Sequence, residues 1–173
     1  MRRDIANSTE DKHFSILMEY GLLFKFKLTS FVVFSAMMAY LVSLNGHIEL
    51  IPFAILFVGG FCITAAANTL NEVLEKDYDK LMRRTADRPV AAGRMTSSHA
   101  VFVAGVMWLF GVICLSYFNI FAALLGSLAV VTYAFIYTPL KRYSTLAVFV
   151  GSFPGALPLL IGNVAAVGHI DQM

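Results

Sequence analysis

The chain has 173 residues, of which 58% are hydrophobic and only 14% are charged, and its formal net charge is +2. Soluble domains carry roughly 25% charged residues, so this composition, with a mean hydropathy of +0.73, excludes an ordinary soluble domain. Cys62 and Cys114 fall in apolar stretches and form no C-x-x-C pair, so neither a disulfide framework nor a zinc site is expected. We expect no nucleic-acid partner.

Residues 1–24 are too polar for a cleaved signal peptide, because they lack an uninterrupted apolar core before a small-residue site. We expect them to form a cytoplasmic leader, followed over residues 25–173 by part of one transmembrane domain. The apolar residues of that domain fall into five runs of about the 20 residues that cross a bilayer. The runs cover residues 28–44, 50–70, 100–117, 120–137 and 146–167. Unpaired backbone groups are not tolerated in lipid, so the sequence predicts an all-α fold, a polytopic transmembrane helix bundle.

Every lysine and arginine lies on one side of these predicted spans. Five precede the first span, six lie between the second and the third, and Lys141 and Arg142 lie between the fourth and the fifth. Cytoplasmic loops carry an excess of basic residues, so the N-terminus and a loop at residues 71–98 are predicted to be cytoplasmic. The C-terminal residues 168–173 are then predicted to lie on the outer side.

The loop at residues 71–98 concentrates the charge of the chain directly after the second apolar run. Because residues 70–82 contain no proline or glycine, we expect the second helix to continue to Met82. Residues four apart share a helix face, which gives two stripes of polar side chains. One stripe consists of Asn71, Glu75 and Asp79, and the other consists of Glu72, Lys76 and Lys80. We predict that the second stripe is a solvated ladder of ion pairs.

The stripe of Asn71, Glu75 and Asp79 has two interpretations. Two carboxylates at this spacing repel each other by roughly 0.2–0.5 kcal/mol on an exposed helix, and a divalent cation reverses the sign of that term. One amide and two carboxylates are oxygen ligands of the kind that Mg²⁺ accepts, together with substrate phosphates and water. Alternatively, Asp79 pairs with Arg83 while Glu75 points to water, and the stripe binds no metal.

Basic residues follow the stripe directly, which favours a diphosphate pocket because guanidinium groups match phosphate oxygens bidentately. These residues are Arg83, Arg84, Arg88 and Arg94. Arg88 precedes Pro89, which favours an extended backbone, so Arg88 can lie on a loop that folds back over the stripe. The alternative is that the arginines are topology signals that bind lipid headgroups.

Four further residues on the predicted cytoplasmic side are equally ambiguous. Tyr137 and Lys141 belong to the segment "YTPLKR", and Lys25 and Lys27 precede the first span. Each is either part of the anionic-ligand site or an ordinary interface anchor or topology signal. Pro139, in the same segment as Tyr137, is predicted to end the fourth span.

The segments "NEVLEKDYD", "LMRRTADRPVAAG", "YTPLKR" and "GSFPGALPLLIGNVAAVGHID" follow one another along the chain. Together they resemble the intramembrane prenyltransferases of the UbiA superfamily. The superfamily pattern, an Asn followed by acidic residues at four-residue intervals, falls here on Asn71, Glu75 and Asp79. Its Y-x-x-x-K element falls on Tyr137 and Lys141. Within the superfamily the resemblance is closest to the heme O synthases, whose M-x-R-T and R-P elements match residues 82–85 and 88–89.

This resemblance implies a UbiA-like bundle of nine membrane helices around a cavity, of which about five are present here. It implies that Asn71, Glu75 and Asp79 are catalytic residues that hold Mg²⁺. It also implies a set of residues that bind the substrate diphosphate, namely Arg83, Arg84, Arg88, Lys27, Tyr137 and Lys141. The implied reaction transfers a farnesyl group from farnesyl diphosphate to a vinyl group of heme B, giving heme O. The implied location is the bacterial inner membrane, with the lipid bilayer around the helices.

The chain departs from the pattern of that superfamily by ending after five predicted spans. The second acidic motif and a later helix that carries a histidine in heme O synthases have no counterpart here. We therefore expect the chain to be the N-terminal part of a longer protein and to be inactive alone. Two alternatives stay open: a UbiA-type enzyme that prenylates an aromatic or quinone precursor, and a non-catalytic membrane scaffold or transporter subunit whose charged loop binds lipid.

Overall fold

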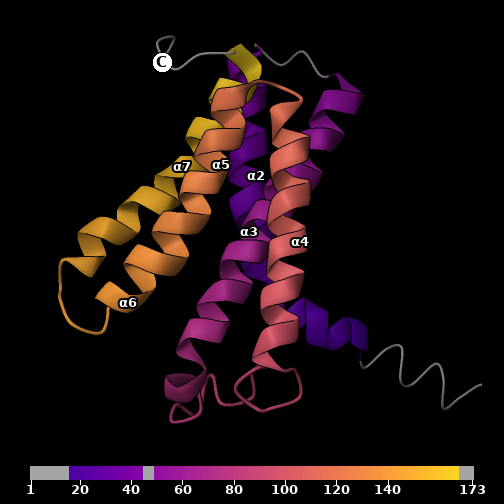
Figure 1. The fold of residues 1–173 in the computed structure, drawn as a ribbon. Coiled ribbons are helices and arrows are strands. Elements are labelled where there is room, and N and C mark those ends of the chain that lie inside the picture. Colours follow the sequence, from indigo (N-terminus) through magenta and orange to yellow (C-terminus); the bar gives the residue numbers. More distant parts are fainter. Residues whose placement is uncertain (1–15, 45–48, 168–173) are drawn as a thin grey trace, which may run out of the picture.

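The computed structural model describes residues 16–44 and 49–167 and consists, over these residues, of helices and turns (Figure 1). Five helical segments are long and apolar enough to cross a membrane, which confirms the predicted all-α bundle and its five spans. The elements are α2 (Phe26–Ser43), α3 (Leu50–Asp79), α4 (Ser97–Ser116), the continuous series α5 (Ile120–Val131), η1 (Thr132–Tyr137) and α6 (Thr138–Leu140), and α7 (Ala147–Val167). The chain is therefore an integral membrane protein.

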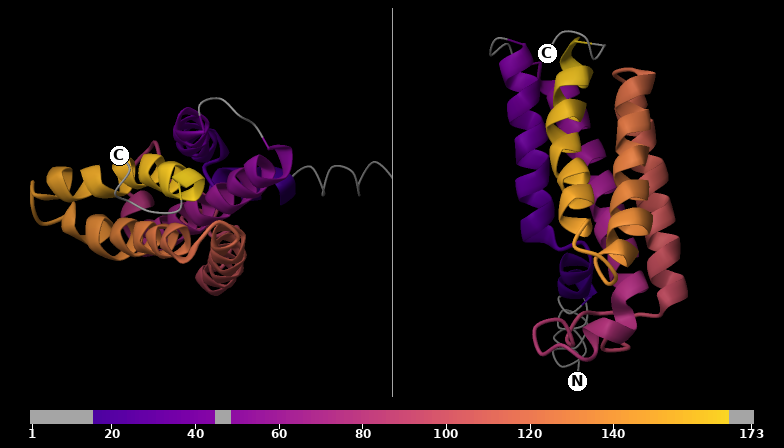
Figure 2. Two further views of the ribbon diagram at one scale, coloured as in Figure 1. Left: turned by 90° about the horizontal axis from the view of Figure 1, so that it is seen from above. Right: turned by 90° about the vertical axis from the view of Figure 1, so that its left-hand side faces the viewer.

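Helix α3 is the central element and packs along α4, which runs beside it in the opposite direction (Figure 1). Glycines allow the two helices to approach closely: a Cβ at Gly111 would lie 2.8 Å from the Ile63 side chain, and one at Gly59 would lie 2.9 Å from Cys114 Cβ. Helix α7 lies between α2 and α5 (Figure 2). The helices α2, α3, α5 and α7 thus surround a common interior.

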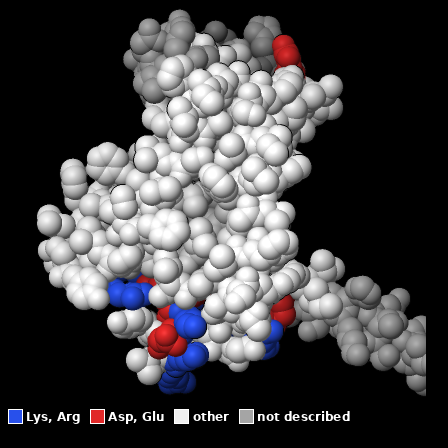
Figure 3. Space-filling view, in the orientation of Figure 1, with Lys and Arg blue, Asp and Glu red and all other residues white. Residues whose placement is uncertain are grey.

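The length of α3 explains where the polar site lies. Its 30 residues give an axial length of about 45 Å, whereas the hydrocarbon core of a bilayer is about 30 Å thick. The C-terminal turns of α3 therefore reach the membrane boundary and carry the charged stripe there. On the face shown in Figure 3, the lysines and arginines gather at this end of the molecule.

Helix α3 ends at Asp79, three residues before the predicted end at Met82. The backbone tightens after Asp79, where the Met82 N–H bonds to the Asp79 carbonyl at 3.2 Å. The Thr85 hydroxyl donates to the same carbonyl at 3.2 Å. These bonds replace the next helical turn, so residues 80–95 form a series of turns before α4.

The fourth span ends at Leu140, one residue beyond Pro139, the residue that was predicted to end it. The π-helical segment η1 leads directly into α6, and Pro139 lies within the first two positions of that short helix. Pro139 lacks the N–H that would bond to the preceding turn, but the π-helical turn before it reaches it without a break. The helix therefore continues to Leu140.

A short helix at residues 16–23 precedes α2 and lies across the charged end of the bundle (Figure 1). It covers the last residues of the predicted leader. Residues 1–15 of that leader, and the predicted outer tail at 168–173, lie outside the described residues. The short helix is tied to α4 by a hydrogen bond of 2.8 Å between the Tyr20 hydroxyl and His99 Nε2.

Candidate functional site

The stripe of Asn71, Glu75 and Asp79 faces the interior of the protein at the charged end of α3. The three residues are only 2%, 7% and 4% exposed, respectively. Their spacing of four residues places them along one face of the helix, as predicted. Burial in this position requires partners, because an unpaired carboxylate away from water is very unfavourable.

Each carboxylate of the stripe is paired with a base from another part of the chain. Lys141 Nζ lies 2.7 Å from Glu75 Oε2, and Arg88 lies 2.6 Å from Asp79 Oδ2. The alternative in which Asp79 pairs with Arg83 and Glu75 points to water is therefore wrong. Arg88 reaches the stripe because the turns at residues 80–95 bring it back over α3, as expected from the Arg88-Pro89 step.

Asn71 joins three elements through its side-chain amide. Its Nδ2 group donates to Glu75 Oε2 at 3.0 Å and to the Thr138 hydroxyl at 2.9 Å. Its Oδ1 atom accepts a bond of 2.8 Å from Lys25 Nζ. Thr138 follows the π-helical segment η1, a form that is rare and often marks functional sites.

Lys25 contacts the stripe directly, through Asn71, although the sequence offers no reason to choose it over Lys27. It lies directly before α2 with a left-handed backbone, at φ 48°, which turns its side chain toward α3. Burial lowers the pKa of Lys25 to about 8, and the nearby charge of Arg88 acts in the same direction. Nothing in the sequence separates this lysine from Lys27, since both precede the same apolar run.

The other predicted residues lie in two groups around the stripe. Tyr137 belongs to the Lys141 group: Lys141 Nζ lies 5.6 Å from the centre of its ring. Lys27 and Arg84 line an open hollow together with Lys25 and Arg88. Arg83 is exposed and does not line this hollow, so a role for Arg83 in the site stays a prediction.

The second stripe is not the solvated ladder that its spacing predicted. Glu72 is fully buried, and its Oε1 atom accepts a bond of 3.1 Å from the Val90 N–H. Lys76 donates instead to the Ser97 hydroxyl at 3.3 Å, and Lys80 pairs with Asp77. The prediction failed because the turns at residues 80–95 cover the face of α3 that carries Glu72.

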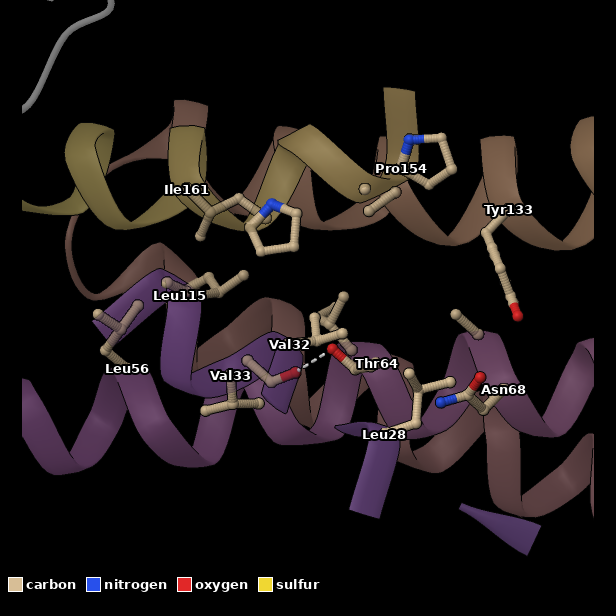
Figure 4. A pocket seen from close by; sticks show the side chains of 17 residues that line it. Leu28, Val32, Val33, Leu56, Thr64, Asn68, Leu115, Tyr133, Pro154 and Ile161 are labelled. Carbon is tan, nitrogen blue, oxygen red and sulfur yellow. Dashed lines mark hydrogen bonds between the residues drawn. The ribbon is translucent and has the colours of Figure 1, made fainter. Parts of the chain in front are cut away.

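An apolar cavity lies inside the bundle, with Asn68, one turn before Asn71 on α3, in its lining (Figure 4). Asn68 and Tyr133 lie at one end of the cavity in this view, and Leu56 lies at the other. Helices α2, α3 and α7 provide most of the remaining wall. Leu28 lines both this cavity and the open hollow with its basic residues, called the basic hollow below, so the two spaces border the same side chain.

A polar site beside an apolar cavity is also what the family of this chain is expected to have, and comparison with known proteins identifies that family. A family model described as the UbiA prenyltransferase family matches residues 32–173. The chain belongs to the UbiA prenyltransferase family. This confirms the family that the sequence motifs resemble.

Relatives within the UbiA family include the protoheme IX farnesyltransferase of Cytophaga hutchinsonii, which is 42% identical over 87% of this chain and 53% of its own length. The protein of the same name from Flavobacterium johnsoniae is 40% identical over 90% of this chain and 52% of its own length. The mitochondrial protoheme IX farnesyltransferase of Arabidopsis thaliana is 38% identical over 88% of this chain and 36% of its own length. The chain thus spans about half the length of the bacterial relatives.

A solved structure, described as giving insights into digeranylgeranylglyceryl phosphate synthase in membranes, has the same fold. Its TM-score is 0.79 at 20% sequence identity, over 86% of this chain and 53% of that one. At this identity the likeness shows the fold alone. It supports the arrangement of the five helical segments around a shared interior.

The donor atoms of this UbiA chain fit a hard divalent cation in number and type. The stripe offers two carboxylates and one amide oxygen, and Mg²⁺ commonly binds through one or two carboxylates and completes its shell with phosphate oxygens and water. Among the described residues, no three His, Cys, Asp or Glu side chains form a cluster that could hold a metal without such help. A cation bound to this stripe would therefore need further ligands besides these side chains.

Proposed function

We propose that this chain forms the prenyl-donor part of a protoheme IX farnesyltransferase, which transfers a farnesyl group from farnesyl diphosphate to a vinyl group of heme B and gives heme O. One observation carries the proposal: the open hollow lined by Arg88, whose guanidinium group pairs with the buried Asp79, shares Leu28 with an apolar cavity inside the bundle. An amphiphile with an anionic head and an apolar tail matches both parts. The names of the relatives support heme B as the acceptor.

The diphosphate is proposed to bind among the basic residues that surround the stripe. Arg84, Arg88, Lys27 and Lys25 line the open hollow, and Lys141 with Tyr137 borders the stripe on its other side. Guanidinium groups bind phosphate oxygens through two parallel hydrogen bonds. Their positive charge stabilises the negative charge that develops on the diphosphate as the bond between the allylic carbon and oxygen breaks.

Asn71, Glu75 and Asp79 are proposed to hold Mg²⁺, which when bound supplies further positive charge beside the leaving group. The bond electrons leave with the diphosphate, and a farnesyl cation remains. The vinyl carbon of heme B attacks this cation, water adds to the resulting heme-side cation, and loss of a proton gives the hydroxyethylfarnesyl group. The apolar wall of the cavity, including Val33 and Ile63, excludes water until the acceptor attacks.

We propose the bacterial inner membrane as the location of this integral membrane protein, with its N-terminus in the cytoplasm. The concentration of lysine and arginine at one end of the described bundle supports this orientation (Figure 3). We further propose that residues 25–173 are the N-terminal part of one UbiA-type domain. The acceptor pocket and the second acidic motif would then come from the rest of the domain.

Binding of inorganic diphosphate to the chain in lipid nanodiscs tests the donor site without requiring turnover. We expect calorimetry to detect binding that depends on Mg²⁺ and that is lost in Asn71→Ala, Glu75→Ala and Asp79→Ala. Asp77→Asn provides a control, because Asp77 lies on the exposed side of the same helix, with 72% of its side chain accessible. Diphosphate binding that is indifferent to Mg²⁺ and to all three substitutions would support a lipid-binding scaffold instead.

The acceptor is tested by co-expressing this chain with the part of the Cytophaga hutchinsonii protein that it does not match. We expect membranes with both parts to convert heme B and farnesyl diphosphate to heme O, detected by mass spectrometry. Transfer to an aromatic quinone precursor in place of heme B would contradict the proposed acceptor. Heme O formed by the chain alone would overturn the prediction that the chain is inactive without further helices.

A further inference from the structure

Glu72 is a buried carboxylate with an unusually poor set of partners. Its side chain is 0% exposed, and within the part of the chain that the structure describes its one hydrogen bond is that which Oε1 accepts from the Val90 N–H at 3.1 Å. The other oxygen, Oε2, is buried and has no hydrogen-bond partner among the described residues. Burying a carboxylate in this way is costly. Stability alone therefore does not explain an acid at this position.

The partner of Glu72 lies in the turns that carry Arg88. Val90 is 4% exposed and packs in a cluster with Leu23 and Ala100. The turns also close on themselves: the Met95 N–H bonds to the Pro89 carbonyl at 3.0 Å. Residues 88–95 thus form a small unit whose backbone is joined to α3 by Glu72.

Only Pro89 separates the Val90 amide from Arg88. The proline ring fixes its own φ near −65° and restricts the backbone of Arg88, so little freedom remains between the two residues. Arg88 in turn lies 2.6 Å from Asp79 Oδ2, two turns along α3 from Glu72. A side chain that holds the Val90 amide therefore also restricts the backbone position from which the Arg88 side chain reaches Asp79.

We propose that Glu72 is a positioning residue: by holding the Val90 amide, it keeps Arg88 beside Asp79, where Arg88 lines the basic hollow. Glu72 acts through this loop, and it is not assigned a contact with substrate or metal. That the positioned guanidinium group serves diphosphate binding rests on the proposed function. The tether itself rests only on the contacts of Glu72, Val90 and Arg88.

Two substitutions separate the hydrogen bond from the charge. Glu72→Gln removes the charge but keeps a side-chain oxygen that can accept from Val90, whereas Glu72→Leu removes the acceptor and fills the space with a side chain of similar volume. The leucine variant is chosen because it leaves no large cavity and no buried charge. Asp77→Asn on the same helix is the matched control, since Asp77 is exposed.

The tether is tested by hydrogen–deuterium exchange of peptides that cover residues 85–95, in the full chain in nanodiscs. We expect exchange about tenfold faster in Glu72→Leu, because the lost bond is worth on the order of one tenfold step in the local opening equilibrium. Glu72→Gln and Asp77→Asn are expected to match the unsubstituted chain. Unchanged exchange in Glu72→Leu overturns the proposal, as does a Glu72→Gln variant that exchanges as fast as Glu72→Leu.

The link to Arg88 is tested by calorimetry with inorganic diphosphate and Mg²⁺. In the unsubstituted background, we expect Glu72→Leu to weaken diphosphate binding about tenfold. When Arg88→Ala is already present, we expect Glu72→Leu to cause no further loss of affinity, because both changes then remove the same contact. A full additional loss in the Arg88→Ala background overturns the proposal. If the unsubstituted chain binds no diphosphate, the proposed function fails, whereas the exchange experiment still decides whether Glu72 holds the loop.

Discussion

At the scale of single residues, the site consists of two ion pairs and a hydrogen bond from a lysine to an amide oxygen. Glu75 pairs with Lys141 and Asp79 pairs with Arg88, while Asn71 accepts from Lys25. Buried pairs of this kind repay little of their desolvation cost. A diphosphate that arrives with a divalent cation offers each group a new partner, because the bases can bind phosphate oxygens and the acids can bind the metal. Under the proposed function, the pairing would therefore favour joint binding of the two ligands.

Arg88 allows a residue-scale prediction about the geometry of its charge. Arg88→Lys keeps the positive charge but replaces the planar fork with a single ammonium group. We expect binding of diphosphate with Mg²⁺ to weaken by about threefold to tenfold, because a bidentate contact becomes a single one. Calorimetry on the chain in nanodiscs measures the change.

The exposed Arg83 provides the comparison for Arg88→Lys. Arg83 lies outside the basic hollow, so we expect Arg83→Lys to change the diphosphate affinity less than Arg88→Lys does. A larger effect at Arg83 than at Arg88 would show that the guanidinium group paired with Asp79 is not the one that binds the anion.

At the scale of elements, the cavity depends on how α2 and α7 cross. Gly162 in α7 lies against the backbone of α2: a Cβ at this glycine would overlap the carbonyl oxygen of Ala36. Near the other end of α7, a Cβ at Gly151 would lie 2.7 Å from the Tyr137 ring. Small residues thus let α7 approach its neighbours at two points. Pro154 and Pro158 lie between them and line the cavity.

Gly162→Ala tests this crossing. The added methyl group meets rigid backbone, so the helices must separate, and we expect the free energy of unfolding to fall by roughly 1–3 kcal/mol. Unfolding by titration with sodium dodecyl sulfate in mixed micelles measures the change. Gly105→Ala in α4 is the control, because its Cβ would meet no atom within 4 Å, and alanine favours a helix by up to about 1 kcal/mol over glycine. Equal effects of the two substitutions would contradict the close crossing at Gly162.

At the scale of the whole molecule, the features that could be predicted from the sequence are those that depend on neighbouring residues alone. The five spans follow from runs of apolar residues, and the Asn71 stripe follows from helical spacing. The predicted ladder of ion pairs at Glu72 was wrong because residue spacing does not show which face of a helix a distant segment covers. Here the segment that contains Val90 covers the face that carries Glu72. Lys25 was not singled out for a similar reason: its contact with Asn71 joins residues 46 positions apart. The helix end at Asp79 also depends on a longer-range bond, from Thr85.

The orientation of the whole bundle gives the last prediction. Leu81 lies in the turns after α3, where the side chain is 83% exposed, and Tyr117 lies at the end of α4, where it is 58% exposed. Since α4 crosses the bundle between these positions, the two residues lie at opposite ends. The positive-inside rule assigns the end with Leu81 to the cytoplasm.

Cysteine labelling measures this orientation directly. In a Cys114→Ala background, in which the remaining Cys62 is buried, we expect a membrane-impermeant maleimide to label Tyr117→Cys in intact spheroplasts. Leu81→Cys should be labelled only after the membrane is permeabilised. The reverse pattern would place the basic hollow outside the cell, away from the cytoplasmic pool of prenyl diphosphates, and would contradict both the orientation and the proposed donor site. Labelling of both positions in intact spheroplasts would contradict the crossing of α4 itself.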